Sequence, residues 1–321
     1  MADESGEKFV LVTGASGFVG GHVVRELVGR GFTAICLVRD EAKLAARIGP
    51  LESEAIVPVQ GSVFDEQDLA RCLEHADAAI HLVGIITESG GADPTFHRVH
   101  VEATRSVVKA CEAAGVRRYV HMSALGARPG DFEVSPYHQT KWQAELAVRD
   151  SGLDWTIFRP SLIHGPDGEF MQMMKYFATP SLRQPVMPFF GKGQSRIQPV
   201  HVKDVARCFV RALESDETIH AEYELGGSEV YTWKKLYDVC ARAIHGKPRM
   251  TVSIPVPVAK FLARFLMPLL PASLVPYKFD VGQVMMSQAD SVCDTTPVEQ
   301  WLNTRMRPFR AELVRYADQI R

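Results

Sequence analysis

The sequence predicts an α/β fold, with a doubly wound parallel sheet followed by a smaller, mostly helical C-terminal cap. Short apolar runs alternate with amphipathic stretches from residue 10 to residue 159, as in a parallel sheet that helices cover on both faces. The first run ends in a glycine-spaced turn that opens a helical pattern. Beyond Pro160 the alternation stops, and prolines and glycines become frequent. We therefore expect a sheet domain at residues 1–160 and a cap at residues 161–321, with residues 197–226 packing back on the sheet domain.

The individual elements follow from the hydrophobic periodicity. After the first strand and a helix at residues 19–30, strands are expected at residues 33–39, 55–60, 78–83, 118–123 and 154–159. Helices are expected between them at residues 40–48, 66–75, 94–114 and 136–150. In the cap we expect helices at residues 202–213 and 232–244, the second with Thr232 as its N-cap, and a short strand at residues 222–225.

The glycine turn at residues 14–20 predicts a site for a dinucleotide. Gly14 and Gly17 permit a tight turn and a close approach of the backbone to a pyrophosphate, and Gly20 lets the following helix pack against the strand. N–H groups at the start of that helix would hold the phosphates. The residues expected to contact the cofactor here are Gly14, Ser16, Gly17, Phe18, Val19 and Gly20. The alternative is a tight strand-to-helix turn that binds no nucleotide.

The end of the second strand indicates which dinucleotide binds. Arg39 stands about nineteen residues after Gly20, where NAD-binding proteins commonly place an acid for the ribose diol. A guanidinium instead suits a 2′-phosphate, and Lys43 would add charge one turn into the next helix. The sequence therefore favours NADP(H). Asp40 keeps NAD(H) as the alternative, and a solvated charge at the strand end is the structural alternative for Arg39.

A second pattern, residues 135–141, predicts a proton-transfer site. Ser135 suits an N-cap and Pro136 the first helical position, which places Tyr137 in the first turn and Lys141 one turn later on the same face. A tyrosine has a pKa of about 10, so it needs nearby positive charge to act as a base near neutrality, which Lys141 and an oxidised nicotinamide would supply. Ser123, at the end of the fifth strand, could hydrogen-bond a substrate oxygen.

Composition excludes several classes of partner. The net charge of -2 and the absence of basic blocks argue against nucleic-acid binding. The six cysteines stand singly, without the spacing of a disulfide framework or a zinc site, which favours reduced thiols in a cytosol-like compartment. The polar, acidic start has neither a secretory nor a transit pattern. We expect no metal.

The apolar stretch at residues 256–270 contains Lys260, Arg264 and Pro268 and is shorter than the ~20 residues of a membrane span. No transmembrane helix is therefore expected. An amphipathic helix that lines the substrate cleft is our first interpretation, and a helix resting on a membrane or a partner is the alternative. The cap is also rich in Met and Phe, at positions 171, 173, 174, 177, 189 and 190, which suggests either a hydrophobic substrate or an ordinary core.

The glycine turn, Ser123 and the pair Tyr137/Lys141 together resemble the short-chain dehydrogenase/reductase superfamily, in its extended or atypical branch. Further matches are residues 61–63 with Asp65, residues 159–165 and residues 199–206. Within the branch, the cap resembles proteins related to the NADPH-binding accessory subunit of respiratory complex I and its bacterial relatives. The resemblance implies a Rossmann-type fold, Ser123, Tyr137 and Lys141 as catalytic residues, and further cofactor contacts from Ser62, Val63, Val83, Gly84, Lys141, Pro160, Leu162 and Ile163.

The chain departs from the family pattern at two positions. Ser62 stands where the family usually has an acidic residue, so adenine recognition would rely on the backbone, the Ser62 hydroxyl or Val63. His100 stands where the family usually has an asparagine of the proton relay. His97 lies three residues before it, a spacing compatible with metal ligation, but without the cysteine or carboxylate partners of a zinc site a polar helix face is expected.

Two functional hypotheses follow from the resemblance. The first is an NADP(H)-dependent oxidoreductase, or an epimerase or dehydratase that oxidises its substrate transiently, acting on a hydrophobic carbonyl or hydroxyl compound. The second is a non-catalytic NADPH-holding subunit of a membrane-associated complex, with a dinucleotide-dependent redox sensor as a weaker variant. Either is expected in the cytoplasm or on the matrix side of an organelle, with peripheral membrane contact as an option.

Overall fold

The computed structural model describes residues 8–49, 54–88, 94–129, 135–181, 185–271 and 273–320. These residues fall into two compact units. The sheet unit takes the described parts of Met1–Ala127, Thr140–Arg159 and Val202–Tyr223, and the cap unit those of Arg128–Gln139, Pro160–His201 and Glu224–Arg321. Residues 135–139, which the sequence places with the sheet domain, therefore belong to the cap unit. Ser135 lies beside Gly282 there, since a Cβ on that glycine would be 3.5 Å from the serine hydroxyl.

Within the described residues, the main sheet has seven strands in the order β11-β6-β5-β4-β1-β2-β3. Their bounds are β1 Lys8–Thr13, β2 Phe32–Val38, β3 Ile56–Gln60, β4 Ala78–His81, β5 Arg118–Met122, β6 Asp154–Pro160 and β11 Ala221–Leu225. The strands from β6 to β3 run parallel to their neighbours. The predicted doubly wound parallel sheet is confirmed, and β1 lies at the point where the strand order reverses, beside which such sheets bind their ligands.

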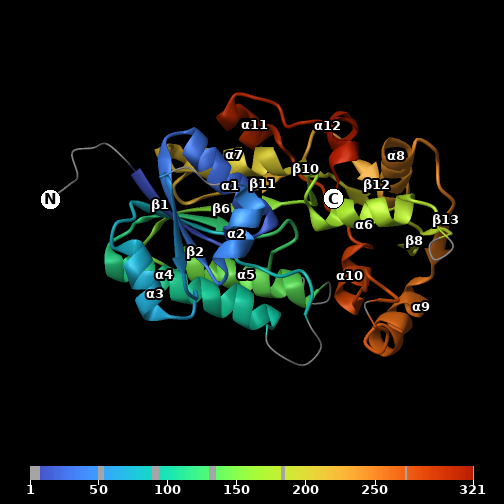
Figure 1. The fold of residues 1–321 in the computed structure, drawn as a ribbon, viewed down its shortest axis with the longest axis horizontal. Coiled ribbons are helices and arrows are strands. Elements are labelled where there is room, and N and C mark those ends of the chain that lie inside the picture. The colour runs from blue at the N-terminus through green and yellow to red at the C-terminus, as the bar shows by residue number, and fades with distance from the viewer. Residues whose placement is uncertain are drawn as a thin grey trace. The chain divides into compact units, whose positions relative to one another are not determined.

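Helices cover both faces of this sheet (Figure 1). They are α1 Phe18–Gly29, α2 Glu41–Ile48, α3 Glu66–Leu73, α4 Ala103–Ala114, α5 Pro136–Arg149 and α7 Val202–Ala212. Leu11, Ala79, Tyr119 and Ile157, from four neighbouring strands, share one core with residues of α3, α4 and α5. On the other face α1 packs on α7, and the α7 residue Phe209 has its ring centroid 4.8 Å from that of Phe158.

The predicted elements of the sheet unit are confirmed with small changes at their ends. The strand predicted at residues 78–83 ends at His81, so Val83 and Gly84 lie in the loop that follows. The helix predicted at residues 94–114 begins later, with a π-helical stretch, η1 (His97–Glu102), before α4. Thr95 accounts for this start, because its hydroxyl accepts a hydrogen bond from the Arg98 N–H at 3.2 Å, as an N-cap does.

The cap unit is mostly helical. Its helices are α6 Glu169–Ala178, α8 Trp233–His245, α9 Val256–Phe261, α10 Val281–Met286, α11 Thr296–Leu302 and α12 Phe309–Tyr316, with a π-helical η3 at Leu262–Leu266. Short strands pair within the unit: β7 Ile163–His164 with β10 Val200–His201, β9 Arg196–Ile197 with β12 Tyr231–Thr232, and β8 Met187–Phe190 with β13 Thr251–Ile254. The predicted Thr232 N-cap of α8 is confirmed, since its side chain accepts from the Lys235 N–H.

The methionines of the cap fit the ordinary-core interpretation better. Met171 and Met174 on α6 are fully buried and share a core with Leu236 and Cys240 of α8 and Phe309 of α12. Their role is therefore to pack the unit together. Among the residues that the structure describes, no helix has both the length and the apolar character needed to cross a membrane.

Candidate functional site

The glycine turn is as tight as its spacing predicts. Gly14 has a φ of +78°, a conformation that L side chains rarely adopt, and Gly17 donates its N–H to the Gly14 carbonyl oxygen at 3.0 Å. A Cβ on Gly20 would lie 2.1 Å from that oxygen, so only glycine fits there. The exposed N-cap residue of α1 is Gly17, which has no side chain to cap the first N–H groups. The turn therefore presents helix N–H groups at the switch point of the sheet, which fits a pyrophosphate.

Lys141 packs against the loop that follows β4. Its side chain is buried, and Nζ donates to the Met122 carbonyl oxygen at 2.9 Å. A Cβ on Gly84 would be 3.1 Å from Nζ, so the glycine allows the loop to lie against the ammonium group. Burial lowers the pKa of Lys141 to about 8, and the carboxylate of Glu145 only partly offsets this effect. Lys141 is thus a buried cation that titrates close to neutral pH.

Ser123 follows β5 directly and adjoins the carbonyl that holds Lys141. Its N–H donates to the Phe158 carbonyl oxygen at 2.8 Å, which fixes the backbone, and its hydroxyl is buried without a hydrogen-bond partner among the described residues. A buried, unpaired hydroxyl costs about 1–3 kcal/mol, so such a group is usually completed by a ligand or by ordered water. The Ser123 hydroxyl is therefore available to donate a hydrogen bond to a substrate oxygen.

Tyr137 lies in the first turn of α5, as predicted. The Ser135 hydroxyl accepts from the Tyr137 N–H at 3.2 Å, and the Gln139 N–H donates to the Ser135 carbonyl, which confirms Ser135 as the N-cap. Burial raises the pKa of Tyr137 to about 12. The cause is the loss of solvation, and a lowering of this pKa by Lys141 and an oxidised nicotinamide stays a prediction. The phenol of Tyr137 is protonated at neutral pH.

His100 forms hydrogen bonds with the loop after β4 and with α5. It lies in the π-helical stretch η1, with Nδ1 2.8 Å from the Thr140 hydroxyl and Nε2 within hydrogen-bond distance of the Ile85 backbone. Burial and the nearby Lys141 lower its pKa to about 2, so the ring is neutral. His97, in contrast, is exposed and 3.8 Å from Glu102. The two histidines face different surroundings, and no cluster in the described part of the chain could hold a metal ion.

The end of β2 presents exposed positive charge. Arg39 and Lys43 are both exposed, and Arg39 makes no hydrogen bond or ion pair with any residue that the structure describes. The neighbouring acid, Asp40, is the N-cap of α2 and accepts from the Lys43 N–H at 3.2 Å. The carboxylate of Asp40, the residue next to Arg39, thus accepts a hydrogen bond from the helix backbone. The Arg39 guanidinium is free to bind an anion.

The loop after β3 contacts a carboxylate that the sequence did not single out. Asp68 on α3 accepts from the Ser62 N–H at 2.9 Å and forms an ion pair with Arg71. The Ser62 hydroxyl accepts from the Phe64 N–H at 3.2 Å, so it holds the turn, and Val63 packs on the core. A Cβ on Gly61 would lie 2.5 Å from the Asp68 carboxyl group, so a side chain at position 61 would collide with this acid. The position of Asp68 could be recognised only once α3 was placed over the loop.

The predicted nicotinamide segment, residues 160–163, belongs to the cap unit. The Ser161 N–H donates to the Leu225 carbonyl oxygen at 2.8 Å, and the Leu162 carbonyl oxygen accepts from the Val200 N–H at 2.9 Å. Ile163 then enters β7. These bonds give the segment a fixed backbone, and its contact with a nicotinamide stays a prediction.

Two buried histidines beside this site were missed. Thr13, His81 and His121 are register partners on β1, β4 and β5, and the Thr13 hydroxyl lies 2.7 Å from His81 Nδ1. The rings of His81 and His121 stack at 5.6 Å, and both nitrogens of His121 lack a partner among the described residues. Burial lowers the pKa of both, that of His81 to about 3. In the sequence, these histidines could have been found from their positions near the ends of neighbouring strands, in register with Thr13 at the end of β1.

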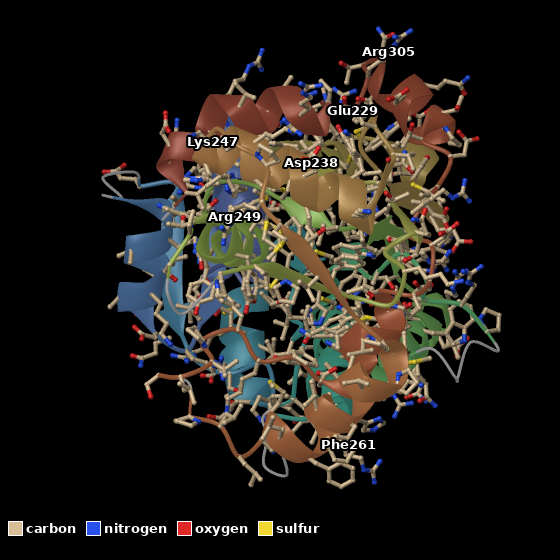
Figure 2. All side chains as sticks on the ribbon, turned by 90° about the vertical axis from the view of Figure 1, so that its right-hand side faces the viewer. Glu229, Asp238, Lys247, Arg249, Phe261 and Arg305 are labelled. Carbon is tan, nitrogen blue, oxygen red and sulfur yellow. The ribbon has the colours of Figure 1, made fainter. Side chains whose placement is uncertain are left out.

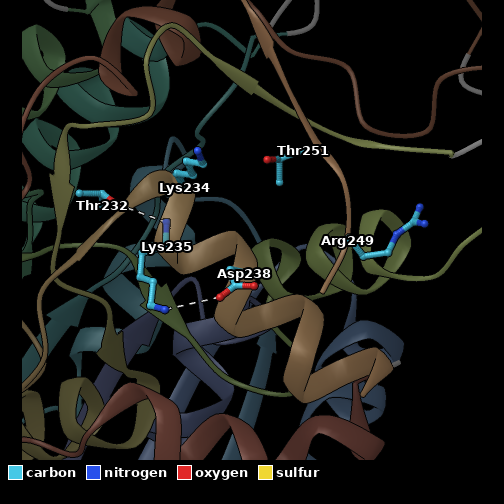
Figure 3. A pocket seen from close by; sticks show the side chains of 6 residues that line it. All are labelled: Thr232, Lys234, Lys235, Asp238, Arg249 and Thr251. Atoms are coloured by element: carbon cyan, nitrogen blue, oxygen red, sulfur yellow. Dashed lines mark hydrogen bonds and ion pairs between the residues drawn. The ribbon is translucent and has the colours of Figure 1, made fainter. Parts of the chain in front are cut away.

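The surface hollow in Figure 3 lies elsewhere, on the cap unit. It has a volume of about 350 Å³ and is lined by Thr232, Lys234, Lys235, Asp238, Arg249 and Thr251. Thr232 caps α8 and Lys235 pairs with Asp238 at 3.5 Å, so these side chains serve the helix itself. None of the predicted site residues lines it, and the chemistry described above gives it no role.

The sheet unit thus brings together the glycine turn, the Val83–Gly84 loop, Lys141 and Ser123, whereas Tyr137 and residues 160–163 lie in the cap unit. A parallel sheet with a glycine turn at its switch point defines the class of dinucleotide-binding α/β proteins. Residues 14–216 match the family model described as NAD(P)H-binding. The chain belongs to this NAD(P)H-binding family of Rossmann-type, short-chain dehydrogenase/reductase-like proteins.

Curated relatives and solved structures agree with this assignment. The chain is 29% identical over 289 residues to the NADH dehydrogenase [ubiquinone] 1 alpha subcomplex subunit 9 of Arabidopsis thaliana, covering 88% of this chain and 70% of that protein. It is 31% identical to the ceramide reductase of Caulobacter vibrioides, covering 77% and 74%. The UDP-glucuronic acid 4-epimerase of Bacillus cereus, solved with UDP-glucuronic acid and NAD, has a TM-score of 0.75 at 19% identity, covering 98% of this chain and 100% of that one. The family match supports a nicotinamide dinucleotide as the cofactor of this chain.

Proposed function

We propose that this chain is an NADP(H)-dependent reductase of a hydrophobic carbonyl compound. The observation that carries the proposal is the buried, unpartnered hydroxyl of Ser123 next to the carbonyl that holds Lys141. A purely structural site would be expected to satisfy this hydroxyl within the protein, since leaving it unpaired is costly. A substrate oxygen that accepts from Ser123 would remove the cost.

Each catalytic residue then has one task. When bound, the nicotinamide supplies the hydride that reduces the carbonyl carbon. Ser123 donates a hydrogen bond to the carbonyl oxygen and orients it. Tyr137, which burial keeps protonated, gives the oxygen its proton, and the alcohol is the product. Lys141, a buried cation, is the group that we propose to stabilise the phenolate left by this transfer.

NADP(H) is the cofactor we propose, with NAD(H) as the alternative. Arg39 is exposed and free among the described residues, and Lys43 adds a second cation one turn into α2. The carboxylate of Asp40, which could otherwise receive a ribose diol, accepts from the backbone of α2. Both observations support recognition of a 2′-phosphate.

The relatives suggest the kind of substrate. The Caulobacter relative is a ceramide reductase by name, which points to a long-chain lipid carbonyl as the substrate class. The plant relative, a subunit of an NADH dehydrogenase, supports a second candidate: a subunit that holds NADPH in a membrane-associated complex without turnover. Both candidates are compatible with the cytoplasm or the matrix side of an organelle, and with peripheral membrane contact.

Native mass spectrometry followed by nucleotide release separates the two candidates. A reductase is expected to release NADP(H) on dilution and to oxidise added NADPH with long-chain 3-oxo lipids, which absorbance at the nicotinamide band records. Tyr137→Phe and Ser123→Ala should each lower this rate at least about 100-fold while cofactor affinity changes little. Tyr277→Phe, at a half-buried tyrosine of the cap, is the matched control. Tightly held nucleotide with no lipid-dependent oxidation would favour the accessory subunit, and unchanged turnover in Tyr137→Phe would refute the assigned role.

A further inference from the structure

The cap unit exposes large apolar side chains on the segment that follows β13. α9 and η3 form one helical stretch, Val256–Leu266, in which the small residues Ala259 and Ala263 are buried. Phe261 is 60% exposed and Phe265 55%, with ring centroids 5.1 Å apart. We call the whole exposed set the apolar surface: Val258, Phe261, Phe265, Leu266, Leu269 and Leu274. Figure 2 shows Phe261 projecting outward at one end of the view.

In this arrangement the alanines of the stretch pack inward and the phenylalanines face outward. Their exposure supports the alternative interpretation of the stretch, a helix that rests on a membrane or a partner. Single exposed apolar residues are common on proteins, whereas a cluster that includes two adjacent aromatic rings marks an interaction surface. The large side chains of α9 and η3 therefore need a partner outside the cap unit.

The charge of the segment indicates the chemistry of that partner. Between Asp238 and Asp280 the sequence has no aspartate or glutamate. Its charged residues there are all cations: Arg242, Lys247, Arg249, Lys260, Arg264 and Lys278. Beside the apolar surface, the Arg264 guanidinium lies 5.9 Å from the Phe265 ring centroid. A segment that carries large exposed apolar groups and, along the sequence, only positive charge is complementary to a partner with an apolar interior and an anionic face.

The length of the helical stretch indicates how it would lie relative to a lipid bilayer. The stretch Val256–Leu266 spans roughly 16 Å at 1.5 Å per residue, about half of the ~30 Å hydrocarbon core of a bilayer. It is too short to cross, but it suits a helix that lies in the interface with its apolar face among the acyl chains. Lysine and arginine side chains reach the phosphates from such a position.

We propose that the apolar surface docks on an anionic lipid bilayer, with Phe261 and Phe265 inserted at the headgroup boundary and Lys260 and Arg264 at the level of the phosphates. A second copy of the chain fits less well, because a self-complementary contact through this surface would bring the same cations together without acidic partners. The proposal goes beyond the reductase function and does not depend on it, since an accessory subunit would use the surface equally.

Vesicle flotation of the full chain tests the proposal. We expect binding to vesicles of phosphatidylcholine with a minority of phosphatidylglycerol, and weak binding to phosphatidylcholine alone. Each cation near an anionic surface contributes about fivefold in affinity, so Lys260→Glu with Arg264→Glu should weaken binding at least about 25-fold. Phe261→Ser with Phe265→Ser should weaken it about tenfold or more. Higher salt should release the wild-type chain.

Two controls match these changes at other exposed positions of the cap unit. Arg305→Glu alters charge and Val314→Ser removes an exposed apolar side chain, 65% exposed on α12, and both should bind vesicles as the wild type does. Circular dichroism and nucleotide binding verify that every variant is folded. Failure of the wild type to bind anionic vesicles, or equal binding by the two double variants and the controls, would overturn the proposal. A dimer in solution that the phenylalanine changes abolish would also overturn it, and would assign the surface to a second copy.

Discussion

A Cβ atom on Gly20 would lie 2.1 Å from the carbonyl oxygen of Gly14 and 2.7 Å from the Cα of Ala15. Both contacts involve backbone, which cannot move aside as a side chain can. The start of α1 and the end of β1 therefore meet so closely that a single methyl group would separate them. This contact also sets the direction in which the first N–H groups of α1 point.

We expect Gly20→Ala to destabilise the chain by about 1–3 kcal/mol and to weaken nucleotide binding, because the helix must shift away from the turn. Urea unfolding and nucleotide titration measure the two effects. Gly29→Ala in the same helix is the control, since nothing lies within 4 Å of the position that its methyl group would take and alanine favours helix by about 1 kcal/mol. Unchanged stability and binding in Gly20→Ala would contradict the described turn.

The preference for NADP(H) is expected to depend on Arg39. Replacing it with alanine removes a guanidinium that is exposed and free to bind a phosphate, so NADPH affinity should fall about tenfold or more while NADH affinity changes little. Isothermal titration with both nucleotides measures the ratio. Arg117→Ala, at an exposed arginine paired with Asp154, is the charge-matched control. Equal losses for both nucleotides would show that Arg39 does not read the 2′-phosphate.

Lys141 makes stability depend on pH. Its folded pKa of about 8 lies below the usual lysine value of 10.5, so the unfolded chain binds more protons between these values and the lysine's contribution to stability rises with pH there. Lys141→Met removes the buried charge. The free energy of unfolding of Lys141→Met, minus that of the wild type, should therefore fall by about 2 kcal/mol between pH 7.5 and pH 9.5. Urea unfolding of both proteins at each pH tests this, and a constant difference would mean that the lysine is solvated.

His121 is expected to be replaceable by leucine with a gain in stability. Both ring nitrogens are buried without partners among the described residues, so an apolar side chain of similar size should stabilise the chain by about 1–2 kcal/mol in thermal or urea unfolding. His81→Leu is the comparison, and it should destabilise, because it leaves the Thr13 hydroxyl without its 2.7 Å partner. Destabilisation by His121→Leu would indicate that ordered water satisfies the ring.

Glu145 should contribute far more than an exposed carboxylate. It is fully buried on α5 and accepts from Arg159 at 2.6 and 2.8 Å and from Arg149 at 3.2 Å. Glu145→Gln removes the buried carboxylate of this network and leaves Arg159 paired with the more exposed Glu222 alone. We expect a loss of about 1.5–3 kcal/mol on urea unfolding, as for hydrogen bonds to a charged group. Glu66→Gln breaks the exposed pair with Lys109 and should leave stability almost unchanged. Similar losses for both would contradict the burial of Glu145.

The parallel sheet and the place of the glycine turn could be predicted from the sequence because both depend on local patterns. Hydrophobic runs, the spacing of Gly14, Gly17 and Gly20, and the caps Ser135 and Thr232 act within a few residues of one another. Ser123 and Lys141 could also be named in advance. Their burial could not, since it depends on chain segments that are distant in sequence.

Only the tertiary structure decided the environment of each group. Asp40 and Arg39 are neighbours in sequence, yet the fold directs one carboxylate to the backbone of α2 and leaves the guanidinium free among the described residues. Desolvation, which no local pattern reports, raises the pKa of Tyr137 and lowers that of Lys141. In the stretch Val256–Leu266 the sequence shows apolar residues on every side. Packing of Ala259 and Ala263 against the cap unit turned Phe261 and Phe265 outward, because small side chains allow the closest approach of a helix to its neighbours.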